Sequence, residues 1–209
     1  MSNRRKPISP EQSLTFSDYF NLRVSTEDIL AYFGYSKQNA LLELPSSANQ
    51  LLILESLQAQ INDHLLHISL ENEITRREFL IAPIMSQVRR LTQSKLRSEY
   101  WFEYNHQLKG SFDYYLRREN DLLVVEAKNA DLTRAFTQLA VELIALDKAE
   151  ETDNNVIYGA VSTGQEWQFA KLERLDKRFF QDVNLYVLPT NLEDILRILV
   201  GILENENEN

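Results

Sequence analysis

Residues 110–128 read GSFDYYLRRENDLLVVEAK, in which two apolar runs flank the charged segment 117–121. Aromatic and β-branched residues favour strands, and a short polar segment between two such runs predicts an antiparallel hairpin. If the turn has an even number of residues, Asp113 lies directly opposite Glu126, because side chains alternate across a strand. The other face of the hairpin is then wholly apolar, formed by Phe112, Tyr114, Leu116, Leu123, Val125 and Ala127. A slip of one residue would scramble that face, so the pattern indicates the register.

The same register places reactive side chains together, because Lys128 shares a face of the strand with Glu126, opposite Asp113. Opposed carboxylates repel each other by up to about 1 kcal/mol as a cross-strand pair, so the arrangement favours a bound cation. Oxygen ligands suit Mg²⁺ or Mn²⁺, and a lysine nearby can act on a metal-bound water or on a phosphate. The alternative is a ladder of solvent-exposed salt bridges, because a Glu-x-Lys tripeptide also arises by chance.

With its second carboxylate in Glu126-Ala127-Lys128, thirteen residues after Asp113, the chain resembles the PD-(D/E)xK nuclease superfamily. The resemblance implies that the carboxylates of Asp113 and Glu126 and the carbonyl of Ala127 bind the metal ion. It also implies that Lys128 is the catalytic lysine. Gln138, in the helix that follows, is similar to the glutamine that some branches place beside the metal.

Further stretches resemble the nuclease domain at the N-terminus of type I restriction-enzyme motor subunits. Glu73 opens the sequence EITR, and with the later Pro83 this segment is similar to the first helix of that domain. The resemblance implies a supporting metal ligand there, either Glu73 or Glu78. Residues 158–172 resemble the strand, turn and strand that follow. One departure is that Phe112 stands where the family often has proline.

Hydrophobic periodicity predicts an α/β protein whose mixed β-sheet is flanked by helices. The resemblance implies the same core order, that of a restriction-endonuclease-like fold. We expect four segments: a flexible arm at 1–14, an N-terminal helical extension at 15–68, a nuclease-like core at 69–203 and an acidic tail at 204–209. The extension should contain a helix capped by Ser25 and ending near Gly34, then a longer helix capped by Ser46 or Ser47. In the core we expect helices at 71–92, 133–148 and 191–203, and strands at 100–108, 112–116, 122–128, 155–162, 167–171 and 184–188. Pro83 should kink or break the first of these helices.

The composition favours one cytoplasmic protein. A chain of 209 residues can bury one substantial core, and the absence of cysteine excludes disulfides and thiolate metal sites. No apolar run is long enough to span a membrane. The histidine pair His64 and His67 lacks a third ligand nearby in the sequence, so surface or core roles are the better prediction.

A net charge of -9 argues against a general affinity for nucleic acid, which usually requires a basic surface. Local clusters of basic residues can still serve, and we take Arg76, Arg77 and Arg117 as candidate contacts to nucleic acid. Two functions follow: a Mg²⁺-dependent nuclease acting on nucleic acid, in the first instance DNA, or a non-cleaving binding or assembly module with the same fold. A homodimer is the commonest closed assembly and would suit a nuclease that makes two cuts.

Overall fold

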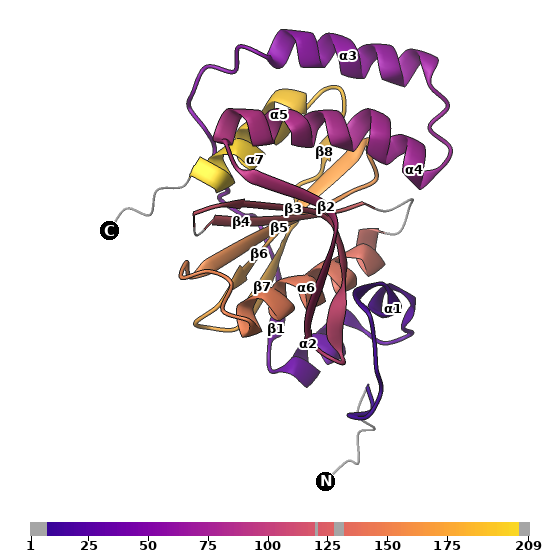
Figure 1. Ribbon diagram of the computed structural model, residues 1–209, viewed down its shortest axis with the longest axis vertical. Coiled ribbons are helices and arrows are strands. Elements are labelled where there is room, and N and C mark those ends of the chain that lie inside the picture. The colour runs from indigo at the N-terminus through magenta and orange to yellow at the C-terminus, as the bar shows by residue number, and fades with distance from the viewer. Residues whose placement is uncertain (1–7, 120, 128–131, 205–209) are drawn as a thin grey trace.

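The structure is a computed structural model and describes residues 8–119, 121–127 and 132–204. One mixed β-sheet lies between two layers of helices (Figure 1). In chain order the strands are β1 (Ser36–Ala40), β2 (Lys95–Asn105), β3 (Leu108–Arg118), β4 (Asp121–Ala127), β5 (Val156–Ser162), β6 (Glu166–Glu173), β7 (Arg178–Asp182) and β8 (Tyr186–Val187). The helices are α1 (Phe16–Asn21), α2 (Thr26–Phe33), α3 (Leu54–His67), α4 (Glu73–Arg76), the π-helical segment η1 (Arg77–Ile81), α5 (Ala82–Thr92), α6 (Leu132–Lys148) and α7 (Leu192–Glu204). The prediction of an α/β protein with a mixed sheet flanked by helices is confirmed.

The sheet has the strand order β1-β7-β6-β5-β4-β3-β2, with β8 paired to β6. Strands joined by short turns pair antiparallel, as in the hairpins β2–β3, β3–β4 and β5–β6. β4 and β5 are parallel, because α6 carries the chain from the end of one strand to the start of the other. This crossover brings α6 over the sheet directly after the strand that carries Glu126.

Helices α1, α2 and α6 cover one face of the sheet, the lower face in Figure 1. Phe136, Leu139, Leu143 and Ile144 of α6 are buried, as the helical spacing predicts. The burial is broader than one stripe, since every residue from Ala135 to Leu146 is buried. A helix that is buried all round needs cover on both sides, and α1 and α2 supply it on the side away from the sheet.

The opposite face is covered by α3, by α7 and by the segment α4–η1–α5 (Figure 1). Ile84, Met85 and Val88 of α5 are fully buried there. The helix predicted for residues 71–92 is present as this continuous segment, interrupted by η1 just before Pro83. The interruption has a local cause, because proline has no N–H to donate to the preceding turn.

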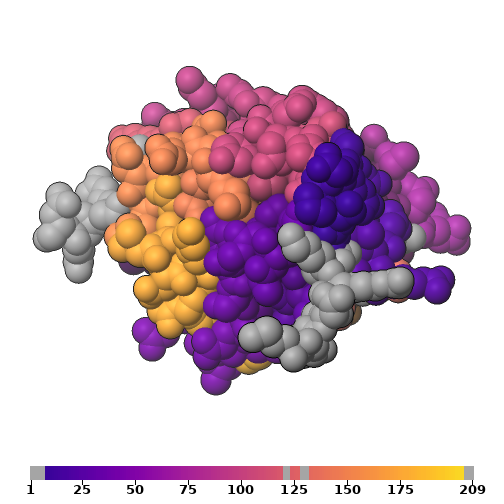
Figure 2. All heavy atoms as spheres, turned by 90° about the horizontal axis from the view of Figure 1, so that it is seen from below, coloured from indigo at the N-terminus to yellow at the C-terminus, as the bar shows by residue number. Residues whose placement is uncertain are grey.

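The N-terminal part of the chain is more tightly integrated than predicted. Residues 15–68, expected as a helical extension, contribute β1, which pairs in parallel with β7 at the sheet edge. In Figure 2 these purple residues lie against the yellow-orange residues of the C-terminal half. Of the predicted flexible arm, residues 1–7 lie outside the described structure, whereas Ile8 and Leu14 are buried in the core. These core contacts hold residues 8–14 against the sheet and its helices.

Several boundaries differ from the prediction. α2 is capped by Ser25 and ends at Gly34 as expected, but α3 begins at Leu54 instead of near Ser47. The Ser47 hydroxyl donates to Glu204 of α7 at 2.8 Å, so a tertiary contact takes the group expected to cap a helix. β1 and β7 were missed, and β2 and β3 are longer than predicted. No helix in the described part of the chain is long and apolar enough to cross a membrane.

Candidate functional site

The register of the β3–β4 hairpin is the one expected for an even-numbered turn. Tyr114 pairs with Val125 and Arg118 with Asp121, so the ladder ends one step before Asp113 and Glu126. Glu119, in the turn, has a φ of 49°, which is the left-handed backbone that tight hairpin turns require. The turn and the apolar face therefore select the same register.

The apolar face itself differs at one position. Tyr114, Leu116, Leu123, Val125 and Ala127 lie in the core under α5 and α7, as predicted. Phe112 instead packs on the opposite face, where its ring stacks on Phe16 with centroids 5.3 Å apart.

The cause of this difference is a shift in the side-chain alternation of β3 at Asp113. Across from it, the β2–β3 ladder has bridges at Ser98 and Tyr100 but skips Glu99, whose φ is 49°. Left-handed backbone in a strand breaks the alternation of faces. The side chains of β3 thus change faces at Asp113, and a strictly regular hairpin does not describe its side chain.

Glu126 is fully buried on the α6 side of the sheet. Its Oε1 accepts a hydrogen bond from Gln138 Nε2 at 2.7 Å. The same nitrogen donates to Oε1 of Glu142 at 2.9 Å, and Glu142 is also fully buried. Residues 138 and 142 are one helical turn apart, so α6 presents an amide and a carboxylate together to the end of β4.

Asp113 is held by two groups from other elements. Its Oδ2 accepts from the backbone N–H of Ala127 at 2.8 Å, just past the last pair of the β3–β4 ladder. Its Oδ1 lies 3.4 Å from Nη1 of Arg77, and the side chain is 13% exposed. The carboxylate therefore lies between the backbone of β4 and a cation from η1.

Arg77 links β2 and β3, because it pairs with Glu99 of the first strand and with Asp113 of the second. Besides Asp113, its Nη2 donates to Glu99 Oε1 at 2.5 Å, and its guanidinium lies 5.7 Å from the centre of the Tyr114 ring. Burial alone lowers the pKa of Arg77, but the charges of Asp113 and Glu99 more than offset this, and the pKa is raised. Arg77 was predicted as a contact to nucleic acid; in this structure it is an ion-pair partner of two acids.

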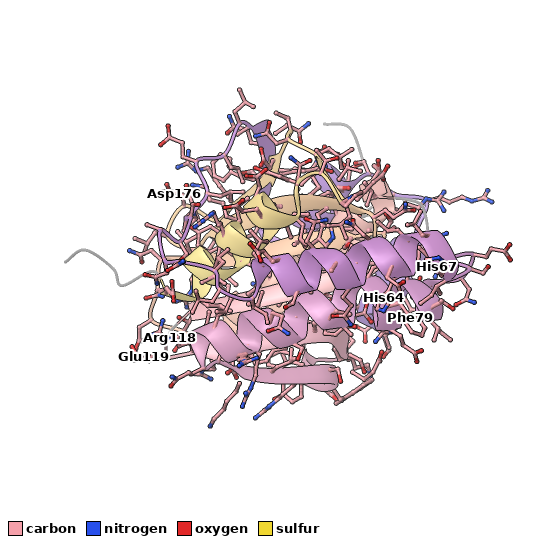
Figure 3. The ribbon with its side chains drawn as sticks, turned by 90° about the horizontal axis from the view of Figure 1, so that it is seen from above. His64, His67, Phe79, Arg118, Glu119 and Asp176 are labelled. Carbon is pink, nitrogen blue, oxygen red and sulfur yellow. The ribbon has the colours of Figure 1, made fainter. Side chains whose placement is uncertain are left out.

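The π-helical segment that begins at Arg77 is stabilised from α3. An unbroken α-helix would pair the Phe79 carbonyl with the amide of residue 83, which is proline. His64 Nδ1 lies 2.6 Å from that carbonyl oxygen, close enough to donate the missing hydrogen bond. The His64 and Phe79 rings also meet edge to face at 5.3 Å, and Figure 3 shows them side by side. This histidine therefore has a structural partner.

The other predicted residues lie at different places. Lys128 is outside the described residues. Glu73 begins α4, one helical turn before Arg77, and Glu78 is exposed. Arg76 donates from Nε to the Leu70 carbonyl at 2.5 Å, which ties α4 to the preceding loop.

A cleft of about 610 Å³ opens at the turn end of β3, near Arg118 and Glu119 (Figure 3). It is lined by Leu91, Thr92, Gln93, Lys95, Arg117, Arg118, Glu119 and Glu204. Its arginines are already engaged, since Arg118 donates to the Leu203 carbonyl at 3.1 Å and Arg117 pairs with Glu151 at 3.2 Å. Asp113 is four residues further along β3, roughly 13 Å at the rise of an extended strand. The cleft is therefore distinct from the acids.

The donor set suits a hard divalent cation. Asp113, Glu126 and the Ala127 carbonyl offer only oxygen atoms, and the hydrogen bond from the Ala127 amide to Asp113 joins β3 to β4 at this point. Burial of Glu126 is costly for a charged group and favours a compensating partner. A group of three or more His, Cys, Asp or Glu side chains arranged to hold a metal is not found among residues 8–119, 121–127 and 132–204. Two carboxylates and a carbonyl fit the ion when water completes its shell.

Two residues that contact the site residues, Glu142 and Glu99, were not predicted from the sequence. Glu142 had a signal, because it is a charged residue in the otherwise apolar run Leu139–Leu143, spaced one turn from Gln138. Glu99 had none, since its place depends on the β2–β3 register and on its left-handed backbone. No family model and no curated protein matches this chain.

Proposed function

We propose that this protein is a Mg²⁺-dependent nuclease with a restriction-endonuclease-like core that hydrolyses phosphodiester bonds, in the first instance those of DNA. The observation that carries the proposal is the fully buried Glu126 carboxylate, which is bound by Gln138 and is adjacent in sequence to Ala127, whose amide donates to Asp113. A carboxylate loses its hydration when it is buried, and this costs free energy. A fully buried carboxylate such as Glu126 therefore indicates a structural or chemical role. Such groups in a shared location are candidates for function.

The order of elements supports the same conclusion. A helix at 73–92 precedes the antiparallel strands β2, β3 and β4, and α6 then leads to the parallel strand β5. This order agrees with the core that the sequence resemblance implies. The resemblance and the topology rest on different observations, since one uses spaced residues and the other uses strand pairing.

Each residue has a definite part in the proposed chemistry. Asp113, Glu126 and the Ala127 carbonyl would hold the ion, and Gln138 fixes the Glu126 carboxylate so that one oxygen keeps its orientation. A bound Mg²⁺ supplies a more acidic water and offsets charge on the phosphate. Lys128 positions the attacking water or stabilises the negative charge on phosphorus. The attacking water gives up one proton as its oxygen bonds to phosphorus, the bond to the leaving oxygen breaks, and that oxygen takes up one proton.

The second candidate is a non-cleaving binding or assembly module. It is favoured by the contacts of Asp113, whose two oxygens already interact with the Ala127 amide and with Arg77. Asp113 could then be a structural link between β3, β4 and η1. Both functions predict a stable fold, so only chemistry and metal binding separate them.

Metal-dependent cleavage is the direct test. Purified protein is incubated with Mg²⁺ or Mn²⁺ and with branched, nicked, single-stranded and duplex DNA, and with RNA of matched sequence. We expect cleavage of at least one substrate, its loss in Asp113→Asn, and a fall of roughly a hundredfold or more in Lys128→Met. Asp176→Asn is the matched control, because Asp176 pairs with Arg178 in the turn before β7.

The outcomes distinguish the two functions. Cleavage that survives Asp113→Asn comes from a contaminant or from another site and removes the proposal. No cleavage of any substrate by folded protein, together with measurable metal binding, favours the binding module. Sedimentation velocity on the same samples determines whether the active species is a homodimer.

A further inference from the structure

The contacts of Arg77 suggest how a divalent cation would enter the site. Asp113 Oδ2 accepts a hydrogen bond from the Ala127 amide, and a cation bound by this carboxylate would use the other oxygen, Oδ1. That oxygen is the one that Arg77 approaches, at 3.4 Å. A metal ion and a guanidinium on one carboxylate oxygen would repel each other strongly.

The two ion pairs of Arg77 are unequal. The contact with Glu99 is 2.5 Å and the contact with Asp113 is 3.4 Å. Hydrogen bonds between charged groups are strongest near the shorter distance, so the link to Asp113 is the weaker of the two. It is the contact expected to break first.

The exposed fraction of the side chain increases from Asp113 through Arg77 to Glu99. The side chain of Asp113 is 13% exposed, that of Arg77 is 21% exposed and that of Glu99 is 59% exposed. A guanidinium that leaves Asp113 while keeping Glu99 therefore moves toward solvent. There it would lie beside the metal site at the surface where a phosphate group of a substrate approaches.

We propose that Arg77 is a resident counter-ion that a divalent cation displaces from Asp113, and that the displaced guanidinium, still paired with Glu99, then contacts a phosphate of the nucleic acid. This inference rests on the proposed metal site. It explains how Arg77 can pair with acids in the metal-free protein and still contact a phosphate of the nucleic acid when metal is bound. Metal loading and substrate binding are coupled, because the first frees the group that the second uses.

Metal affinity of the full chain tests the competition. EDTA-treated protein is titrated with Mn²⁺ by calorimetry, as wild type, Arg77→Met and Arg77→Lys. A nearby cation lowers the pKa of a carboxylate by about one to three units, and we expect it to weaken the binding of a metal cation to a comparable degree. Arg77→Met should therefore bind Mn²⁺ at least about tenfold more tightly, whereas Arg77→Lys keeps the charge and should stay close to wild type.

Arg89→Met is the matched control. It removes the same charge from the exposed end of α5, roughly 18 Å further along the helical segment at the usual rise per residue. Such a distance exceeds the screening length in physiological salt, so the Mn²⁺ affinity should change by less than about twofold. Thermal melting in EDTA confirms that each variant is folded.

The role of Glu99 is separated by a double-mutant cycle. Glu99→Gln should weaken Mn²⁺ binding in the wild-type background, because Arg77 then has Asp113 as its remaining acid. In the Arg77→Met background the same change should have no effect. Weakening in both backgrounds would mean that Glu99 binds the ion itself, which contradicts the proposal.

Substrate binding gives the second readout. With Ca²⁺ as the metal and a fluorescent DNA duplex as the probe, Arg77→Met should reduce the metal-dependent part of the affinity and leave the part measured in EDTA unchanged. Equal Mn²⁺ affinity in wild type and Arg77→Met overturns the inference while leaving the metal site intact. Tighter binding in Arg77→Met without any DNA cleavage upholds the competition and removes only the nuclease function. Absence of Mn²⁺ binding in both proteins overturns the inference and the metal site together.

Discussion

Replacing Gln138 by leucine should destabilise the protein strongly, because one side-chain amide bridges two buried carboxylates. Gln138 Nε2 donates to Glu126 at 2.7 Å and to Glu142 at 2.9 Å. A hydrogen bond to a charged group contributes about 1.5–3 kcal/mol, so two such bonds sum to about 3–6 kcal/mol. Leucine has nearly the same volume as glutamine, so a cavity adds little to this loss.

The free energy of unfolding is measured by urea denaturation with circular dichroism in EDTA, so that bound metal does not contribute. We expect Gln138→Leu to lose about 3 kcal/mol or more and to melt about 6–12 °C lower. Gln58→Leu is the control, because Gln58 donates to Asn62 on the exposed side of α3 and its loss should cost less than about 0.5 kcal/mol.

A double-mutant cycle with Glu142→Leu checks the bridging geometry. If Gln138 serves both carboxylates, the losses from Gln138→Leu and Glu142→Leu are not additive, and the coupling should be about 1.5 kcal/mol or more. Additive losses, or a Gln138→Leu protein as stable as wild type, would refute the view that this amide holds the two acids together.

Three further predictions concern single positions. His64→Leu should lower the unfolding free energy by about 1–3 kcal/mol, because the helix carbonyl beside the proline loses its donor; an unchanged urea midpoint would contradict this. Gly110→Ala should cost about 1–3 kcal/mol in the same assay, because the backbone φ is 146° and an added Cβ would lie 2.9 Å from the Phe16 ring, and a neutral effect would show that this approach is not tight. The pKa of Glu173 is lowered chiefly by its hydrogen bond from Lys171, so its contribution to stability is present above the ordinary glutamate pKa and is lost as the pH falls through the lower folded-state pKa. The difference in unfolding free energy between wild type and Glu173→Gln should therefore shrink between pH 6 and pH 3, and a difference that grows on acidification would reverse the assignment.

The sequence determined the features that depend on neighbours along the chain. The capped helix from Ser25 to Gly34, the buried positions of α6 and the register of the β3–β4 hairpin all follow from local pattern. In each case a short-range rule decides the structure, either a cap, a period of 3.6 or an alternation of two. The interruption before Pro83 belongs to the same group, because it follows from the missing N–H of one residue.

The candidate site was predicted only where it depends on one hairpin and the helix that follows. The hairpin register from Tyr114–Val125 to Arg118–Asp121 is as predicted, whereas the opposition of Asp113 and Glu126 stays a prediction. The placement of Gln138 beside Glu126 follows from the resemblance and is seen in the structure. The predicted face of Phe112 was wrong, since strict alternation does not foresee the change of face within β3 at Asp113.

Only the tertiary structure decided which groups from distant segments meet at these acids. Arg77 reaches Asp113 across 36 positions of the chain, and it meets Glu99 only because η1 packs over the β2–β3 pair. The strand β1 joins the sheet through β7, far away in sequence. Local sequence patterns do not predict such pairings, because the residues before and after an arginine in the chain do not show which distant side chains will contact it. The charge balance of the site is therefore a property of packing, whereas its carboxylates are a property of the hairpin.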